Sequence, residues 1–97
     1  MKILEARFKV AKSREEYEAS VNPHKYVNMP GLKWKIYAFD DIKSKATGIY
    51  FFEDIEVMDS HMANLKDMAN KIDFVSNLEL QVWDVQKKLC KITGASI

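Results

Sequence analysis

The sequence has few of the residues on which many enzymes and secreted proteins depend. It contains 1 cysteine, 2 histidines, 3 glycines and 2 prolines in 97 residues. The lone Cys90 has no internal partner for a disulfide, which favours a reducing compartment. No glycine-rich phosphate loop, paired cysteines or nucleophile elbow is present. His24 and His61 are not accompanied by acidic residues at ligand spacing, so we expect no protein-built metal site.

Charge of one sign and long apolar runs are also missing. The chain has 15 basic and 14 acidic side chains and a net charge of +1. Such a balance supplies no broad positive field for phosphates, so we expect no nucleic-acid partner. No run approaches the roughly 20 apolar residues of a membrane span, and charges interrupt the N-terminus too early for a signal peptide. We therefore expect a cytoplasmic protein that does not bind membranes.

What is present is a clear alternation of strand and helix patterns. Apolar and charged residues alternate from Lys2 to Val10, which predicts a strand. Ser13 and Glu16 have the spacing of a capping box, so a helix should begin at Arg14. Asn22-Pro23 resembles the start of a second short helical turn. The segment from Met29 to Phe52 reads as a hairpin, with lysines along one side of its first strand that suit a sheet edge.

The second half mirrors the first. Asp54 is a predicted N-cap for a helix with one apolar face, and Asn70 is a predicted left-handed C-cap. Alternation around residues 78–83 predicts the last strand, and residues 87–97 read as an arm outside the regular elements that could reach a partner. A chain of this length makes one core, so we expect a single domain over residues 1–97.

The order β-α-β-β-α-β predicts an α+β, ferredoxin-like protomer with a four-stranded antiparallel sheet. Right-handed crossovers give the strand order fourth, first, third, second, and put both helices on one face. Ile49 to Phe52 is apolar without alternation, which indicates that both faces of the third strand are covered. A second copy of the chain is the simplest cover for the other face, so we expect a homodimer.

Several residues are candidates for a site. His61 lies among methionines on the helix face directed at the sheet, where an imidazole could serve as an acid or base, although a structural histidine is the more common case. Tyr50 and Trp34 combine large apolar bodies with polar tips suited to a flat aromatic ligand, although aromatics in strands more often serve only the core. The remaining predicted substrate contacts are Ile36, Met58, Met62 and Leu65.

Three segments carry a family resemblance: residues 30–37 (PGLKWKIY), 47–54 (TGIYFFED) and 82–85 (VWDV). Together with the element order, they resemble the YdhR-type monooxygenases, small members of the dimeric α+β barrel superfamily. The resemblance implies a ferredoxin-like protomer that pairs its sheet with that of a second chain. It also implies oxidation of a small polyketide-like phenol or quinol without metal, flavin or other cofactor. By this analogy Trp34 and Tyr50 contact the substrate, and His61 or Tyr50 assists removal of its proton.

Two other functions use the same barrel and a third uses the same element order. The protein could bind a small aromatic ligand without turning it over, or degrade haem with His61 as the axial ligand. RNA-recognition domains share the order, but they need stacking aromatics on either side of the position of Gly48. Thr47 and Ile49 stand there instead, which argues against RNA binding.

Overall fold

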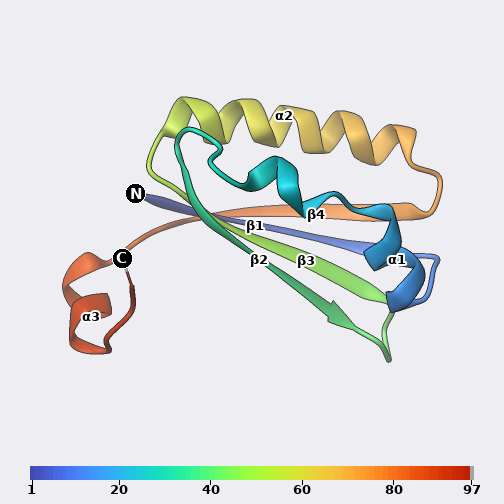
Figure 1. The fold of residues 1–97 in the computed structure, drawn as a ribbon, viewed down its shortest axis with the longest axis horizontal. Helices are drawn as coiled ribbons and strands as arrows, with labels where there is room; N and C mark the ends of the chain where they lie inside the picture. Colours follow the sequence, from blue (N-terminus) through green and yellow to red (C-terminus); the bar gives the residue numbers. More distant parts are fainter. Residues whose placement is uncertain (97) are drawn as a thin grey trace.

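The computed structural model describes residues 1–96 and contains one antiparallel sheet with helices packed on it (Figure 1). The elements follow the order β1 (Lys2–Val10), α1 (Arg14–Ser20), the 3-10 helix η1 (Pro23–Tyr26), β2 (Leu32–Asp40), β3 (Lys45–Phe52), α2 (Ile55–Lys71), β4 (Val75–Asp84) and α3 (Lys87–Ile92). The strand order is β2-β3-β1-β4. The α+β, ferredoxin-like protomer is therefore confirmed, with β2 at one edge as expected.

The helices begin where side chains can satisfy their first backbone amides. Ser13 and Glu16 form the predicted capping box, and Asn22 accepts a hydrogen bond from the backbone nitrogen of His24 at 3.2 Å. Asp54 accepts from the backbone nitrogens of Glu56 at 2.9 Å and of Val57 at 3.3 Å. These contacts confirm the predicted starts of α1, η1 and α2.

Two local predictions are wrong. Asn70 does not cap α2, because the helix continues to Lys71 and Ile72 leaves it in an extended conformation at φ −95°. Residues 87–92 are not irregular but form α3, which places Cys90 in a short helix beyond the end of β4 (Figure 1). Both predictions concern polar segments, in which helix propensity alone is a weak signal.

A bulge in β2 decides which side chains face the helices. Leu32 pairs with Phe52, but Trp34 pairs with Phe51, so Lys33 is an extra residue in the ladder. Because directly paired residues share a face, Lys35 lies on the face of its partner Tyr50, and Trp34 lies on the opposite face. A regular strand would place Leu32 and Trp34 on the same face; the bulge separates them.

The core lies between the sheet and α2. It is built from Leu4 and Ala6 of β1, Tyr50 and Phe52 of β3, and Met58 and Leu65 of α2, all buried. Tyr26, Leu32, Leu80 and Val82 are among the half-buried residues packed against this cluster. The helix-facing side of the sheet is thus apolar where α2 covers it, and it carries tyrosines near η1.

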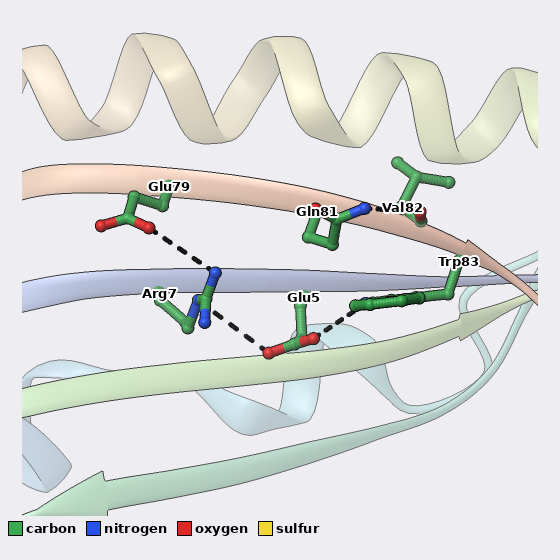
Figure 2. Close-up of polar contacts among 6 residues, drawn as sticks. All are labelled: Glu5, Arg7, Glu79, Gln81, Val82 and Trp83. Atoms are coloured by element: carbon green, nitrogen blue, oxygen red, sulfur yellow. Dashed lines mark hydrogen bonds and ion pairs between the residues drawn. The ribbon is translucent and has the colours of Figure 1, made fainter.

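The opposite side of the sheet, the open face, mixes polar and apolar groups. Trp83 donates its indole N–H to Glu5 at 2.8 Å, and Arg7 contacts Glu79 at 3.5 Å (Figure 2). Ile36 and Trp83 remain 49% and 53% exposed. Phe51, by contrast, is fully buried, with its ring centroid 5.1 Å from that of Trp34. Within residues 1–96, this face therefore carries large exposed apolar side chains beside polar side chains that are hydrogen-bonded or ion-paired.

No helix in the described part of the chain is long and apolar enough to cross a membrane.

Candidate functional site

A cavity of about 230 Å³ lies between the sheet and the helical layer. All four tyrosines of the chain line it, each from a different element: Tyr17 of α1, Tyr26 of η1, Tyr37 of β2 and Tyr50 of β3. Two larger hollows of about 340 and 390 Å³ lie nearer the β2–β3 turn, but they are more open. We call the 230 Å³ space the tyrosine cavity and regard it as the candidate site, because aromatic walls with few polar groups are typical of small-ligand pockets.

The tyrosine rings pack edge to face around one side of the cavity. Tyr26 lies 5.8 Å from Tyr50 and 6.4 Å from Tyr37, measured between ring centroids. Burial and the nearby Tyr26 raise the pKa of Tyr50 far above its ordinary value, and burial raises the pKa of Tyr37 to about 12. Both hydroxyls therefore stay protonated near neutral pH and can donate a hydrogen bond to a ligand oxygen.

Lys35 places a cation among these rings. Its Nζ atom lies 3.8 Å from the ring centroid of Tyr37, 4.0 Å from that of Tyr26 and 4.6 Å from that of Tyr50. Burial, together with the charge of Lys25, lowers the pKa of the Lys35 amine to about 7. The amine is therefore close to half-protonated at neutral pH, unlike an ordinary surface lysine.

Gly48 makes room for this arrangement. A Cβ atom there would lie 3.1 Å from the Tyr50 ring, 3.2 Å from the Tyr50 hydroxyl and 3.2 Å from Cε of Lys35. Gly48 pairs with Tyr37 in the ladder, so the missing side chain leaves a gap on the helix-facing side of the sheet. The Lys35 side chain and the Tyr50 hydroxyl occupy the edge of that gap.

The charge on the cavity wall has one sign. Lys25 and Lys35 are its only charged lining residues, and no aspartate or glutamate among residues 1–96 contributes to the lining. Neither lysine forms an ion pair with a carboxylate of residues 1–96. The cavity therefore favours a ligand that is aromatic and carries a negative charge or a partially negative oxygen.

His61 of α2 is buried beside the cavity. Its ring centroid lies 4.6 Å from that of Tyr50 and 5.8 Å from those of Tyr26 and Phe52. Nε2 is buried without a hydrogen-bond partner, and burial followed by the charge of Lys35 lowers the pKa of His61 to about 4. The imidazole is therefore neutral at physiological pH and a weak proton acceptor there.

The predicted site residues fall into two groups. His61, Tyr50 and Leu65 lie together: Leu65 lines both the tyrosine cavity and an adjoining space of about 240 Å³ that His61 also lines. Met58 is buried in the core and Met62 packs against it, and neither lines these two cavities. Trp34 and Ile36 lie on the open face, away from Tyr50, so the protomer does not bring them to the same site.

Sequence reasoning missed Lys35, Tyr26, Tyr37 and Tyr17 as lining residues. A signal for two of them was available, since Tyr17 and Tyr26 are the large residues of an otherwise thin apolar side in the first helical region. No sequence signal singled out Lys35, because one lysine among several on an edge strand is ordinary.

The described residues offer no metal site and a poor fit to haem. Within residues 1–96, no three histidine, cysteine, aspartate or glutamate side chains cluster closely enough to hold a metal ion. An axial histidine must present a nitrogen to the iron, but Nε2 of His61 is buried, and three aromatic rings pack around the imidazole. His61 therefore does not suit the haem-ligand role considered from the sequence.

Comparison with known proteins identifies the family. A family model described as "Putative mono-oxygenase ydhR" matches residues 3–96. No curated protein matches the chain. The matched region includes every strand and helix, apart from Lys2 at the start of β1, and all the cavity residues described above. On the strength of that nearly complete match, the chain belongs to the ydhR mono-oxygenase family.

Proposed function

We propose that this protein is a cofactor-independent monooxygenase that oxidises a small planar phenol or quinol bound in the tyrosine cavity. The observation that carries the proposal is the composition of the cavity wall: four tyrosines and two lysines, with no carboxylate from the described residues. An electron-rich aromatic ring packs well against tyrosine faces, and an ionising hydroxyl is stabilised by nearby cations. The family assignment supports the oxygenase chemistry.

The chemistry needs no electrons beyond those of the substrate. In an anthrone, a methylene carbon loses two hydrogens and gains one oxygen atom to become a carbonyl. The second oxygen atom of O₂ leaves with those hydrogens as water, so the four electrons required come from the substrate. Removal of a proton comes first, because the resulting anion reduces O₂ far more readily than the neutral molecule. The protein has to bind the ring, accept or direct that proton and exclude bulk water.

Tyr50 and His61 have different proposed roles. The Tyr50 hydroxyl stays protonated because of its raised pKa, so it orients a substrate oxygen by donating a hydrogen bond. His61 packs against the Tyr50 ring, and its lowered pKa makes it a poor base at neutral pH. We therefore assign His61 to positioning Tyr50, and we keep Leu65 as an apolar substrate contact.

Oxygen uptake with a model anthrone or quinol tests this function. We expect enzyme-dependent uptake under air, with one oxygen atom of O₂ incorporated into the product (anthrone to anthraquinone, quinol to hydroxylated quinone), none under nitrogen, and no response to chelators. Tyr50→Phe should reduce turnover about tenfold or more by removing one hydrogen-bond donor. Lys33→Met is the matched control: Lys33 is an exposed neighbour on the same strand and does not line the cavity. Tight anaerobic binding of the quinol without uptake under air would instead identify a non-catalytic binder of small aromatic ligands.

We also propose that the protein works as a homodimer in which a second copy covers the open face. Exposed Ile36 and Trp83 support this, since large apolar side chains on a sheet face favour burial against a partner. Sedimentation equilibrium of the wild-type protein should give twice the 11.3 kDa chain mass. Ile36→Glu, which puts a charge on that face, should shift the population toward monomer, and a monomeric wild type would contradict the proposal.

A further inference from the structure

Of the two lysines on the cavity wall, Lys35 has its amine closer to the tyrosine rings. Three tyrosine rings lie within 4.6 Å of its Nζ atom, and the side chain lines the cavity wall, so the amine can meet a bound ligand. The titratable side chains around it come from five elements: Lys25 and Tyr26 of η1, Tyr17 of α1, Tyr37 of β2, Tyr50 of β3 and His61 of α2. β1 and β4 contribute only apolar residues to the cavity wall. Carboxylates are absent from this set, so the described residues give Lys35 no anionic partner.

We propose that the Lys35 amine accepts the proton of the substrate's phenolic or enolic hydroxyl and then pairs, as an ammonium, with the phenolate oxygen. The O–H bond breaks, an N–H bond forms, and the electron pair of the broken bond remains on the phenolate oxygen. The result is one phenolate and one ammonium from two neutral groups. This inference rests on the proposed function and identifies the group that ionises its phenolic substrate.

Two opposing influences make Lys35 suitable for this step. The ring faces of Tyr26, Tyr37 and Tyr50 attract the ammonium form, whereas burial and the charge of Lys25 favour the neutral amine. Neither form is strongly preferred near neutral pH, so the amine can take a proton and later return it. His61, a weaker base in the same surroundings, cannot do this as effectively.

Bound phenolate supplies the missing negative charge in the cavity. An ammonium and a phenolate in contact form a charge-assisted hydrogen bond, stronger than one between neutral groups. The neighbouring Tyr50 hydroxyl can donate a second hydrogen bond to the same oxygen, because Gly48 leaves both groups at one gap. The negative charge that makes the ring reactive toward oxygen is therefore held by two donors at one end of the cavity.

The first experiment measures binding without oxygen chemistry. 4-Nitrophenol is yellow only as the phenolate, so its absorbance reports the ionisation of the bound molecule under nitrogen. We expect wild-type protein to bind it as the phenolate at a pH where most of the free phenol is protonated. Lys35→Met should lose this colour shift and bind on the order of tenfold to a hundredfold more weakly, whereas Lys33→Met should behave as wild type. No colour shift on binding to the wild type would overturn the proposal, whether or not the variant folds.

The second experiment separates proton transfer from simple charge pairing. Arginine keeps the positive charge but cannot accept a proton. With Lys35→Arg, oxygen uptake should be low below the phenol's own pKa and recover above it, where the substrate arrives already ionised. Lys35→Met should stay low at both pH values. If uptake by the wild type is normal and Lys35→Met matches it, only this inference fails. If the wild type binds phenolate through Lys35 but never consumes oxygen, the proposed monooxygenase fails and phenolate capture stands.

Discussion

The lowered pKa of Lys35 predicts how the stability of the protein depends on pH. In the folded protein the amine titrates near 7, whereas in the unfolded chain it has its ordinary value of 10.5. Between these values the unfolded chain binds a proton that the folded protein does not. The free energy of unfolding must therefore rise with pH across this window, and the contribution of Lys35 is lost progressively as the pH falls from 10.5 to 7.

The size of the effect follows from the width of the window. One proton contributes at most about 1.4 kcal/mol per pH unit, which gives roughly 4 kcal/mol between pH 7 and 10. Lys35 is only partly buried, so solvent screening reduces the expected gain to about 1–2 kcal/mol. The window ends near pH 10, because the raised pKa values of Tyr37 and Tyr50 oppose further stabilisation once tyrosines ionise in the unfolded chain.

Urea unfolding at a series of pH values measures this gain directly. The wild type should gain stability relative to Lys35→Met as the pH rises from 7 to 10, with the urea midpoints diverging by on the order of 1 M. Lys33→Met, the exposed neighbour, should follow the wild-type curve. Parallel curves for the wild type and Lys35→Met would refute the argument, because they would mean that the amine has the same pKa in the folded and unfolded states.

Three further predictions concern individual side chains. Asp54→Ala removes the acceptor for two backbone amides at the start of α2, so it should lower the free energy of unfolding in urea by about 1 kcal/mol. An unchanged midpoint would mean that water replaces the cap. Gly48→Ala brings a Cβ to 3.2 Å from both the Tyr50 hydroxyl and Cε of Lys35. It should therefore lower the free energy of unfolding by about 1 kcal/mol and weaken 4-nitrophenol binding. Wild-type affinity would show that the gap can widen freely. Leu65→Ala removes a side chain only 5% exposed and should lower the free energy of unfolding by about 2–4 kcal/mol, as measured by denaturation at neutral pH. A loss below 1 kcal/mol would indicate that the neighbouring side chains collapse into the space.

Much of the fold could be predicted because its signals are local. The strand Lys2–Val10 alternates in the sequence as it does in the sheet, and Ser13, Asn22 and Asp54 cap the helices that follow them. The element order then led to the strand order, since only a few connections of such elements are compact and right-handed. The prediction failed at Asn70, where α2 continues to Lys71, whose amine pairs with Asp67 one turn earlier at 2.8 Å.

The site could be predicted only in part. His61 and Tyr50 were identified from their residue types and from the apolar pattern of α2 and β3, and they do lie 4.6 Å apart between ring centroids. Trp34 was chosen for its polar-tipped aromatic ring and by the family resemblance, but its neighbours on the open face are not those of Tyr50. A pattern of period two reports which residues share a face only while the ladder stays regular.

The sequence by itself determined the strands, the helices α1, η1 and α2, the order of these elements and the family, because propensity, capping and hydrophobic period act over a few neighbouring residues. Only the tertiary structure decided which face of β2 meets the helices. The bulge at Lys33 depends on pairing with β3, and a shift of one residue exchanges the two faces of a strand. Because of that single irregularity, the Lys35 side chain lies on the helix-facing side of β2, where three tyrosine rings surround its amine. The rings come from segments that meet only in the folded chain.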